Sequence, residues 1–360
     1  MRKVLLLLFL FVMGIYQVSA YDITSSFYYN DEKVSGMWIT REKDSVLMSG
    51  LPFFLKRKGD DKIVYCLEPF VMLNQEEGYE GYYSANSYFN LSEEKLDRIR
   101  LLSFFGYMYP GHEEDKWYGI TQYLIWQTVD EEANIYFVDN RYGDKIEAYV
   151  EEIEEIEFLI SEYKKLIQLN GKNLKFDSMS LFSEFENSNY FLKNLNVENN
   201  MITIRFNREM SEQEIFYYHK GGQNLYLPGN LFDNEINIEI NFIKNVMVKK
   251  WYGSGKYKEE AGAIFEICKI NGDCQNIETD IKGEAKISLD YGIYKIKQLK
   301  GKKGYSFIEE SIFEVNDNSS TVIELYNKAI SIDVPDTYKG NFITDLIMKI
   351  RWYIYDFKIH

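Results

Sequence analysis

The sequence predicts a multidomain protein in which an α+β domain is followed by two β-sandwich-like modules. The chain has 360 residues, more than one hydrophobic core of ordinary size accommodates. Helix and strand patterns are mixed up to residue 171, whereas period-two alternation dominates from there to residue 330. We therefore expect domains at residues 21–171, 172–244 and 245–330, between a leader (1–20) and a tail (331–360).

The leader has the pattern of a secretory signal peptide. Arg2 and Lys3 precede an apolar run that reaches Met13, and small residues follow at Val18-Ser19-Ala20. No later stretch has enough uninterrupted apolar residues to predict a membrane span. We expect the protein to be exported, with its mature chain starting near Tyr21.

The composition and charge exclude several classes of function. With 46% hydrophobic and 16% aromatic residues, the chain has the composition of packed domains. Its net charge of -15 argues against nucleic acid or anionic lipid as the main partner, because both require a basic surface. We expect no cofactor and no metal site.

The first domain is predicted from one buried strand and three helices. The stretch "DKIVYCLEPFVML" indicates a strand that holds Cys66 and ends in a loop at Pro69. Ser92 is the expected N-cap of a helix that continues to Phe105 and stops at Gly106. The other two helices are expected at 117–130 and 145–169.

The rest of the chain is predicted to be β-structure. Residues 172–244 contain alternating segments such as "NMITIRFN" and "NEINIEINFI", and we interpret them as a spacer or stalk without a site of its own. Residues 245–330 contain further strands, and the longest is "AKISLDYGIYKIKQLKGKKGY".

The chain has three cysteines, Cys66, Cys268 and Cys274. The last two flank a strong hairpin-turn signal, Asn271-Gly272, so they either form a small disulfide in an oxidising compartment or remain two free thiols. In both cases Cys66 is left over. An odd cysteine in an exported protein indicates a reactive thiol or intermolecular pairing.

Gln122 is an amide in the apolar stripe of a predicted helix. Its helix neighbours Tyr118, Ile125 and Trp126 are apolar or aromatic, and burying an unpaired amide costs about 1–3 kcal/mol. A cysteine thiolate that attacks such an amide in a dry pocket expels ammonia and leaves a thioester. The alternative is a structural cysteine, Cys66, beside a glutamine that is hydrogen-bonded in the core.

The residues around this pair resemble a known family. The segments "VYCLEP" (64–69) and "TQYLIW" (121–126) resemble the thioester domains of Gram-positive surface adhesins, over roughly residues 22–170. The resemblance implies that Cys66 and Gln122 form an intramolecular thioester, which acylates a lysine amine of a host surface protein. It also implies a single-use reagent at the cell surface rather than an enzyme with turnover. Leu124 departs from the alanine that is frequent in the family.

Five further residues are expected near the thioester. Tyr65, Glu68, Thr121 and Trp126 are candidates to surround it, and His112 is either a proton shuttle or a histidine of a surface loop. A second hypothesis is a secreted cysteine hydrolase or transferase with Cys66 as nucleophile and His112 as base. A third is an adhesin or stalk that binds without a covalent bond.

Residues 245–330 resemble a second family, the B-type repeats of collagen adhesins and the pilins, which have a prealbumin-like β-sandwich. This resemblance is carried by "AGAIFEI" and "GEAKISLDYGIYKIKQL". It implies an isopeptide bond between Lys250 and Asn327. The position of the assisting glutamate holds Gln298, which cannot transfer the proton. A β-sandwich held by its core alone is the alternative.

The tail combines two incomplete signals. Val334-Pro335-Asp336-Thr337 resembles a sortase sorting signal, although valine and tyrosine replace the usual leucine and glycine. The following segment contains charges such as Lys349 and Arg351, too many for a membrane span, and its apolar residues recur at helical spacing. The sequence thus predicts either a degenerate cell-wall signal or a helix at the membrane surface.

Overall fold

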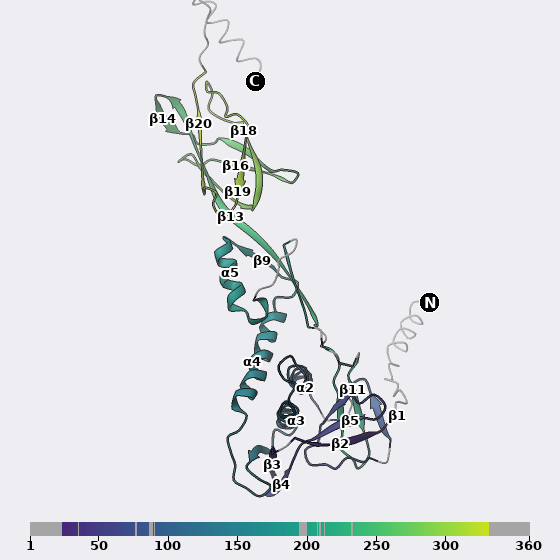
Figure 1. The fold of residues 1–360 in the computed structure, drawn as a ribbon. Coiled ribbons are helices and arrows are strands. Elements are labelled where there is room, and N and C mark those ends of the chain that lie inside the picture. Colours follow the sequence, from purple (N-terminus) through teal and green to yellow (C-terminus); the bar gives the residue numbers. More distant parts are fainter. Residues whose placement is uncertain are drawn as a thin grey trace, which may run out of the picture. The chain divides into compact units, whose positions relative to one another are not determined.

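The computed structural model describes residues 24–330, except for residues 35, 76–77, 86–88, 90, 194–199, 207, 209, 212 and 232. The expected signal peptide and tail lie outside the described residues. Two compact units are present (Figure 1). Unit 1 holds the described residues up to Leu174 together with Ser183–Ile240, and unit 2 holds Lys175–Phe182 and the described residues from Asn241.

Unit 1 is built on a seven-stranded antiparallel sheet, whose strands come from both ends of the unit's sequence. The spatial order is β1 (Thr24–Ser25), β7 (Tyr79–Tyr82), β11 (Ile215–Tyr218), β12 (Leu225–Leu227), β6 (Ile63–Cys66), β5 (Phe53–Arg57) and β2 (Phe27–Lys33). A smaller antiparallel sheet has the order β4 (Val46–Gly50), β3 (Trp38–Lys43) and β8 (Asn134–Val138).

Three helices of unit 1 pack together, α2 with α3 and α4 with both (Figure 1). Helix α2 (Glu93–Phe105) begins after Ser92, whose side chain accepts a hydrogen bond from the Lys95 amide, as predicted for its N-cap. Helix α3 (Asp115–Val129) is buried along nearly its whole length. The Tyr118 hydroxyl fixes α3 to the sheet, because it donates to the Val64 carbonyl and accepts from the Leu55 amide.

Helix α4 (Val150–Ile167) starts five residues later than the periodicity predicts. Lys145 forms a β-bridge with Val138, and Tyr149 has a positive φ of 57°, which a helix does not allow. The helix is followed by Gly171 with φ of 68°, the left-handed conformation expected of its stop signal.

The predicted spacer module over 172–244 is wrong. Strand β11 pairs with β7, and β12 pairs with β6, so both belong to the sheet that carries Cys66. The segment also contains β9 (Asn173–Phe176), α5 (Met179–Ser188), the 3-10 helix η1 (Tyr190–Leu192) and β10 (Met201–Arg205). The alternating pattern was identified correctly. Strand pairing, however, is not local, and it places β11 and β12 in the sheet of the first domain.

The long strand β13 (Glu235–Ser254) begins in unit 1, where it pairs with β10, and continues in unit 2. In unit 2 it pairs with β14 (Lys256–Glu259) and β17 (Glu284–Asp290), both antiparallel, and with β20 (Val322–Asn327), parallel. A second sheet has the order β16 (Cys274–Glu278), β15 (Ile264–Lys269), β18 (Gly292–Lys300) and β19 (Ser311–Val315).

Unit 2 is the β-sandwich that the sequence predicts for 245–330. Side chains from both of its sheets meet in one core, including Val248 of β13, Phe265 of β15 and Ile296 of β18. The described residues thus form one sandwich where the sequence predicts two. Among the described residues, no helix combines the length and apolar character that a membrane span requires.

Candidate functional site

Cys66 is the last residue of strand β6, and it lies opposite Leu225 of strand β12. The Leu67 amide donates to the Asn224 carbonyl over 2.8 Å, which continues the pairing beyond the strand. Gln223 precedes β12 and follows a tight turn at Gly221, whose φ is 85°. The local pairing therefore holds the side chains of Cys66 and Gln223 against each other.

The Cys66 sulfur contacts the amide of Gln223. Its thiol donates to Oε1 of Gln223 over 2.5 Å, which is shorter than its 3.0 Å contact with the Glu68 carbonyl. The nitrogen of the same amide, Nε2, is buried and has no hydrogen-bond partner among the described residues. The sulfur thus faces an amide whose leaving nitrogen is not held.

Gln122 approaches Cys66 in a different way. Its Oε1 accepts from the Cys66 backbone amide, and its Nε2 donates to the Cys66 carbonyl, both over 2.8 Å. The amide of Gln122 is thus fully occupied by the backbone. The structure brings Gln122 to Cys66, as the sequence predicts, but through the Cys66 backbone, and the amide next to the sulfur belongs to Gln223.

Sequence reasoning did not identify Gln223, because residues 172–244 were interpreted as a spacer. The only local signal is Gly221-Gly222, a turn signal directly before a buried strand. Neither residue type nor spacing distinguishes Gln223 from other glutamines of the chain. Only the pairing of β12 with β6 does so.

The surroundings of Cys66 disfavour its charged form. Burial raises the pKa of the thiol to about 12, although the Glu68 backbone and the Trp126 side chain counteract this rise. Tyr118 and Ile125 are fully buried, as expected for a dry site. The indole Nε1 of Trp126 is buried and makes no hydrogen bond within the described part of the chain. It nevertheless lies close enough to the sulfur to counteract the rise in the pKa of the thiol.

The other predicted neighbours have supporting contacts. Glu68 accepts from the Asn224 amide over 2.8 Å and so fixes the residue next to Gln223. Tyr65 stacks on Tyr118 with a ring separation of 5.3 Å. Thr121 accepts from the Tyr107 amide and donates to a carbonyl of its own helix, which ties α3 to the turn after α2.

His112 lies elsewhere, and neither interpretation from the sequence describes it. It is buried rather than on a surface loop, it stacks on Trp117, and its Nδ1 lies 2.8 Å from the Phe105 carbonyl. Its Nε2 is 3.4 Å from a carboxylate oxygen of Glu155. These contacts join α2, α3 and α4, and His112 does not line the pocket that contains Cys66. The structure gives it no role as a base for the sulfur.

A pocket of about 640 Å³ opens onto Cys66 and Gln223. Cys66, Gln223, Gln122 and Trp126 all line it. This volume lies within the roughly 300–1,000 Å³ that is typical of small-molecule sites. A small reagent or one side chain of a partner therefore has room to reach the sulfur.

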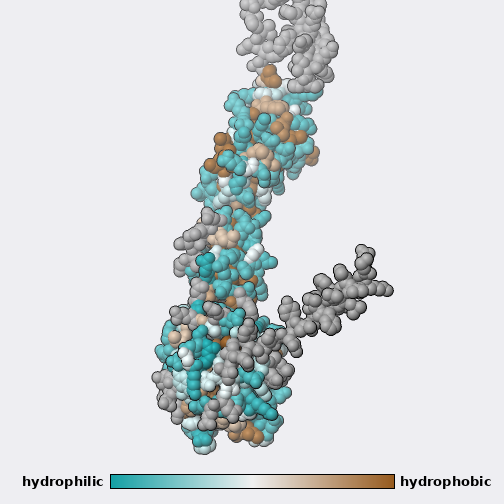
Figure 2. Space-filling model, turned by 90° about the vertical axis from the view of Figure 1, so that its right-hand side faces the viewer, coloured by the Kyte–Doolittle hydropathy of each residue, from teal (hydrophilic) through white to brown (hydrophobic). Residues whose placement is uncertain are grey.

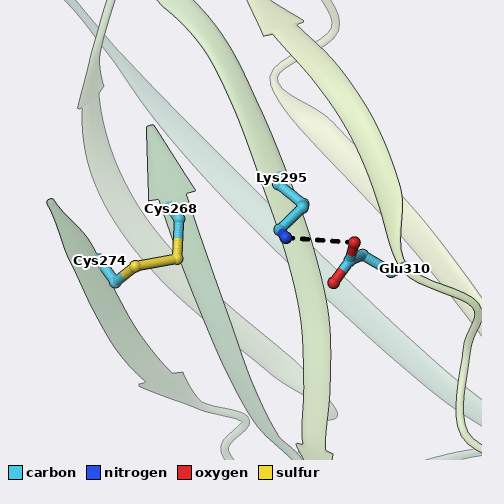
Figure 3. Close-up of a disulfide and its surroundings, with 4 residues drawn as sticks. All are labelled: Cys268, Cys274, Lys295 and Glu310. Carbon is cyan, nitrogen blue, oxygen red and sulfur yellow. Dashed lines mark ion pairs between the residues drawn. A yellow bond between two sulfur atoms is a disulfide. The ribbon is translucent and has the colours of Figure 1, made fainter. Parts of the chain in front are cut away.

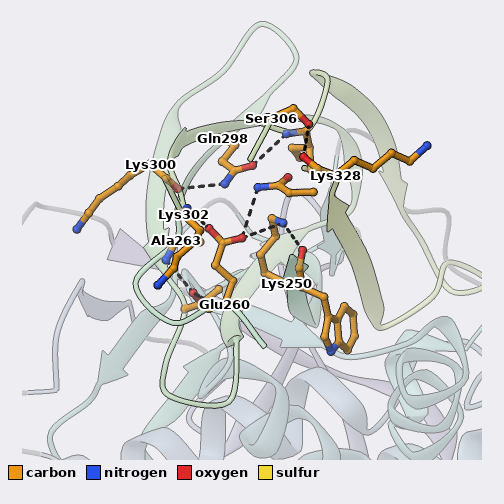
Figure 4. Close-up of polar contacts among 12 residues, drawn as sticks. Lys250, Glu260, Ala263, Gln298, Lys300, Lys302, Ser306 and Lys328 are labelled. Carbon is orange, nitrogen blue, oxygen red and sulfur yellow. Dashed lines mark hydrogen bonds and ion pairs between the residues drawn. The ribbon is translucent and has the colours of Figure 1, made fainter. Parts of the chain in front are cut away.

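Unit 2 contains a second buried polar cluster, which Figure 4 shows. Lys250 is fully buried on β13, and its Nζ lies 3.1 Å from Oε2 of Glu260. The same Glu260 oxygen accepts from the Asn327 side-chain amide over 3.4 Å. Burial lowers the pKa of Lys250, although the Glu260 carboxylate counteracts this effect. Lys250 and Asn327 are both buried, as strand parity predicts, and the pairing of β13 with β20 brings them into the same cluster.

Gln298, which the sequence places at the position of the assisting acid, is not the residue that contacts Lys250 and Asn327. The sequence places Gln298 at the expected acid position, but its amide donates to the Lys300 carbonyl and accepts from the Ile308 amide. The carboxylate that contacts both Lys250 and Asn327 is that of Glu260. It follows the hairpin at Gly253 and Gly255, both with positive φ, so strand parity counted from Lys250 does not reach it.

The predicted disulfide is present between Cys268 and Cys274, which face each other on β15 and β16 (Figure 3). The free-thiol alternative therefore does not apply to these two residues in the structure. Cys66 is the free cysteine that remains. The disulfide cysteines and Glu266 form the one group of potential metal ligands within the described ranges, but the two sulfurs are bonded to each other.

Comparison with protein families gives a match to one part of the chain. The family model described as the SpaA prealbumin-like fold domain matches residues 245–329. A comparison with curated proteins finds no match.

Three solved structures illustrate the neighbours in fold. The thioester domain of the Staphylococcus aureus TIE protein has 14% identity and a TM-score of 0.37, over 61% of this chain and 98% of that one. The Bacillus anthracis TIE protein has 13% identity and a TM-score of 0.28, over 87% of this chain and 69% of that one. The minor pilin GBS52 of Streptococcus agalactiae has 18% identity and a TM-score of 0.24, over 36% of this chain and 66% of that one.

Proposed function

We propose that this protein is an exported surface adhesin of a Gram-positive bacterium, which binds a partner protein covalently through an internal thioester between Cys66 and Gln223. The observation that carries the proposal is the 2.5 Å contact between the Cys66 sulfur and Gln223 Oε1. The buried and unpartnered Nε2 of Gln223 supports it. Export and attachment rest on the sequence patterns of the leader and the tail.

Thioester formation needs no outside reagent. The Cys66 sulfur attacks the side-chain carbonyl carbon of Gln223, and a C–S bond forms while the C–N bond breaks. The nitrogen leaves as ammonia and takes the proton that the thiol gives up. The apolar walls exclude water, which would otherwise hydrolyse the product. Gln122 holds the Cys66 backbone through two hydrogen bonds during the reaction.

The thioester then reacts once with an amine of the partner. The amine nitrogen adds to the acyl carbon of Gln223, and Cys66 leaves as a thiolate, which takes up the proton that the amine loses. The buried N–H of Trp126 is a donor available to this thiolate. Because the acyl group stays on the partner amine, the protein is consumed and does not turn over as an enzyme.

Methylamine tests the proposal directly. It is expected to add to the mature protein, to release one thiol, and to leave N-methylglutamine at position 223 in peptide sequencing. Cys66→Ala should have the full mass calculated from its own sequence, whereas the wild type should be lighter than its calculated mass by one ammonia, and the variant should not react. Label at position 122 would reassign the acyl group to Gln122, and a wild type of full mass with a titratable thiol would rule out the thioester. Repeated turnover of a substrate would favour the hydrolase.

We also propose that unit 2 carries an isopeptide bond between Lys250 and Asn327. The specific observation in its favour is that one Glu260 oxygen contacts both nitrogens. The neutral Lys250 amine would attack the Asn327 side-chain carbonyl carbon, and ammonia would leave. Glu260 would carry the proton between the two nitrogens. Such a cross-link joins the first and last strands of a module that serves as a stalk.

A further inference from the structure

The pocket at Cys66 and Gln223 is a groove that is lined in part by the small sheet of β4, β3 and β8. Thr40 of β3 lies opposite Ser49 of β4 and opposite Tyr136 of β8, so these three residues share one face of the small sheet. All three line the pocket. The facing wall is the loop after β6, which contributes Phe70, Val71 and Met72.

The rim of the groove exposes large apolar side chains. Leu47 is 64% exposed, Met72 is 76% exposed and Tyr142 is 86% exposed, and all three line the pocket. Figure 2 shows hydrophobic residues at the end of unit 1 at which Figure 1 labels β3 and β4. Single exposed apolar residues are ordinary, but their concentration around one opening indicates an interaction surface.

The charged side chain of the groove favours ligands of one sign. Among the described residues that line it, Arg141 is the one that carries a charge, although the chain has a net charge of -15. Its guanidinium is exposed and lies 5.4 Å from the centre of the Tyr142 ring. A carboxylate of a ligand would find a partner there, whereas an ammonium group would find none among the lining side chains.

We propose that this groove binds a peptide segment of the partner protein in which the reactive lysine is flanked by apolar side chains and by a carboxylate that pairs with Arg141. The inference rests on the proposed thioester and goes further by specifying its substrate class. The flanking apolar residues would cover Leu47, Met72 and Tyr142, and the lysine side chain would extend between the walls to the acyl carbon.

The same composition favours reaction of the lysine. A lysine must lose its proton before it can attack, and a pocket whose described lining is largely apolar and holds no carboxylate does not stabilise the ammonium form. The neutral amine then forms the C–N bond, the C–S bond breaks, and Cys66 ends as the thiol. Binding energy from the flanking residues thus compensates for the cost of desolvating the amine.

The test compares two lysine peptides with methylamine, which needs no docking. One peptide carries leucine, phenylalanine and glutamate around its lysine, and the other carries serine and glutamine at those positions. Adduct formation with the wild type is followed by intact mass. The first peptide is expected to react at least about tenfold faster than the second, since tenfold corresponds to about 1.4 kcal/mol of binding.

Variants of the rim complete the test. Leu47→Ser combined with Met72→Ser should remove most of the preference for the first peptide over the second, because both exposed side chains belong to the rim that the apolar neighbours would cover. Arg141→Glu should slow the glutamate peptide in particular. Ile281→Ser removes an exposed apolar residue of unit 2 and should change nothing.

Two outcomes overturn the proposal, and they are distinguishable. If methylamine reacts but both peptides react equally fast in the wild type, the groove does not select apolar and acidic neighbours. If methylamine does not react either, the thioester itself is absent and the proposed function fails together with the groove.

Discussion

The sulfur of Cys66 lies 2.5 Å from the amide oxygen of Gln223, although 157 residues separate them in the chain. Gln122 reaches the same cysteine from helix α3, but its amide binds the backbone. Two glutamines therefore contact Cys66, one at its sulfur and the other at its backbone. In the proposed reaction, Gln223 is consumed and Gln122 holds the nucleophile in position.

Exchange of the two glutamines for leucine should have different consequences. Gln223→Leu should have the full mass calculated from its own sequence, without the loss of one ammonia, and should leave a free thiol at Cys66. Gln122→Leu leaves the buried N–H and C=O of Cys66 without their partners, so the free energy of unfolding should fall by about 1–3 kcal/mol for each group. Denaturant unfolding measures the second effect, and intact mass measures the first.

Peptide mapping of the wild type decides between the glutamines. A thioester-linked fragment pair that contains residues 66 and 223 is expected. A pair that contains residues 66 and 122 would contradict the assignment, whatever the variants do.

The elements of the fold were largely predictable because their signals are local. Short stretches of sequence are enough to recognise the Ser92 cap, the apolar stripe of α3 and the alternation in β13, β17 and β18. Helix α5 was missed, since it lies within residues that were assigned to a β-module. The start of α4 was placed too early because helical periodicity continues through Tyr149, where the backbone is left-handed.

The sites were only partly predictable because their last components depend on register. Cys66, Gln122, Lys250 and Asn327 follow from residue type, face and resemblance. Gln223 and Glu260 do not. Gln223 reaches Cys66 only because β12 inserts between β11 and β6, and Glu260 reaches Lys250 only around a glycine hairpin. One sequence does not determine either pairing.

The pH dependence of the free thiol follows from its burial. In Gln223→Leu, Cys66 should remain a thiol, and burial raises its pKa from 9.0 to about 12. A raised pKa means that less thiolate is present at any pH below it, so alkylation by iodoacetamide should be slow at pH 7. The rate should rise about tenfold per pH unit, and this rise should continue well beyond pH 9. An ordinary cysteine levels off near its pKa of about 8.5.

The comparison for this prediction is the same variant in denaturant, where the thiol is exposed. Its alkylation rate should level off near pH 9. A rate in the native Gln223→Leu protein that also levels off there would contradict the influence of burial on the Cys66 pKa.

Loss of the disulfide should affect stability without affecting either proposed cross-link. Cys268 and Cys274 close a loop with a sequence separation of 6, so Cys268→Ser with Cys274→Ser should lower the free energy of unfolding by about 2 kcal/mol. Thermal unfolding measures the change. The intact mass should still lack the ammonia of both cross-links, because neither cluster contacts the disulfide. A mass heavier by one ammonia would contradict their independence.

Glu260→Gln should abolish the proposed isopeptide bond. Its oxygen contacts Lys250 Nζ at 3.1 Å and the Asn327 amide at 3.4 Å, and a glutamine cannot carry the proton from one nitrogen to the other. The variant should gain the mass of one ammonia, and its free energy of unfolding should fall by about 4 kcal/mol from the lost loop closure alone. Glu259→Gln changes an exposed neighbour on β14 and should keep the bond. If Glu260→Gln retains the lower mass, the bond forms without Glu260 and the assignment of this carboxylate as proton carrier is wrong.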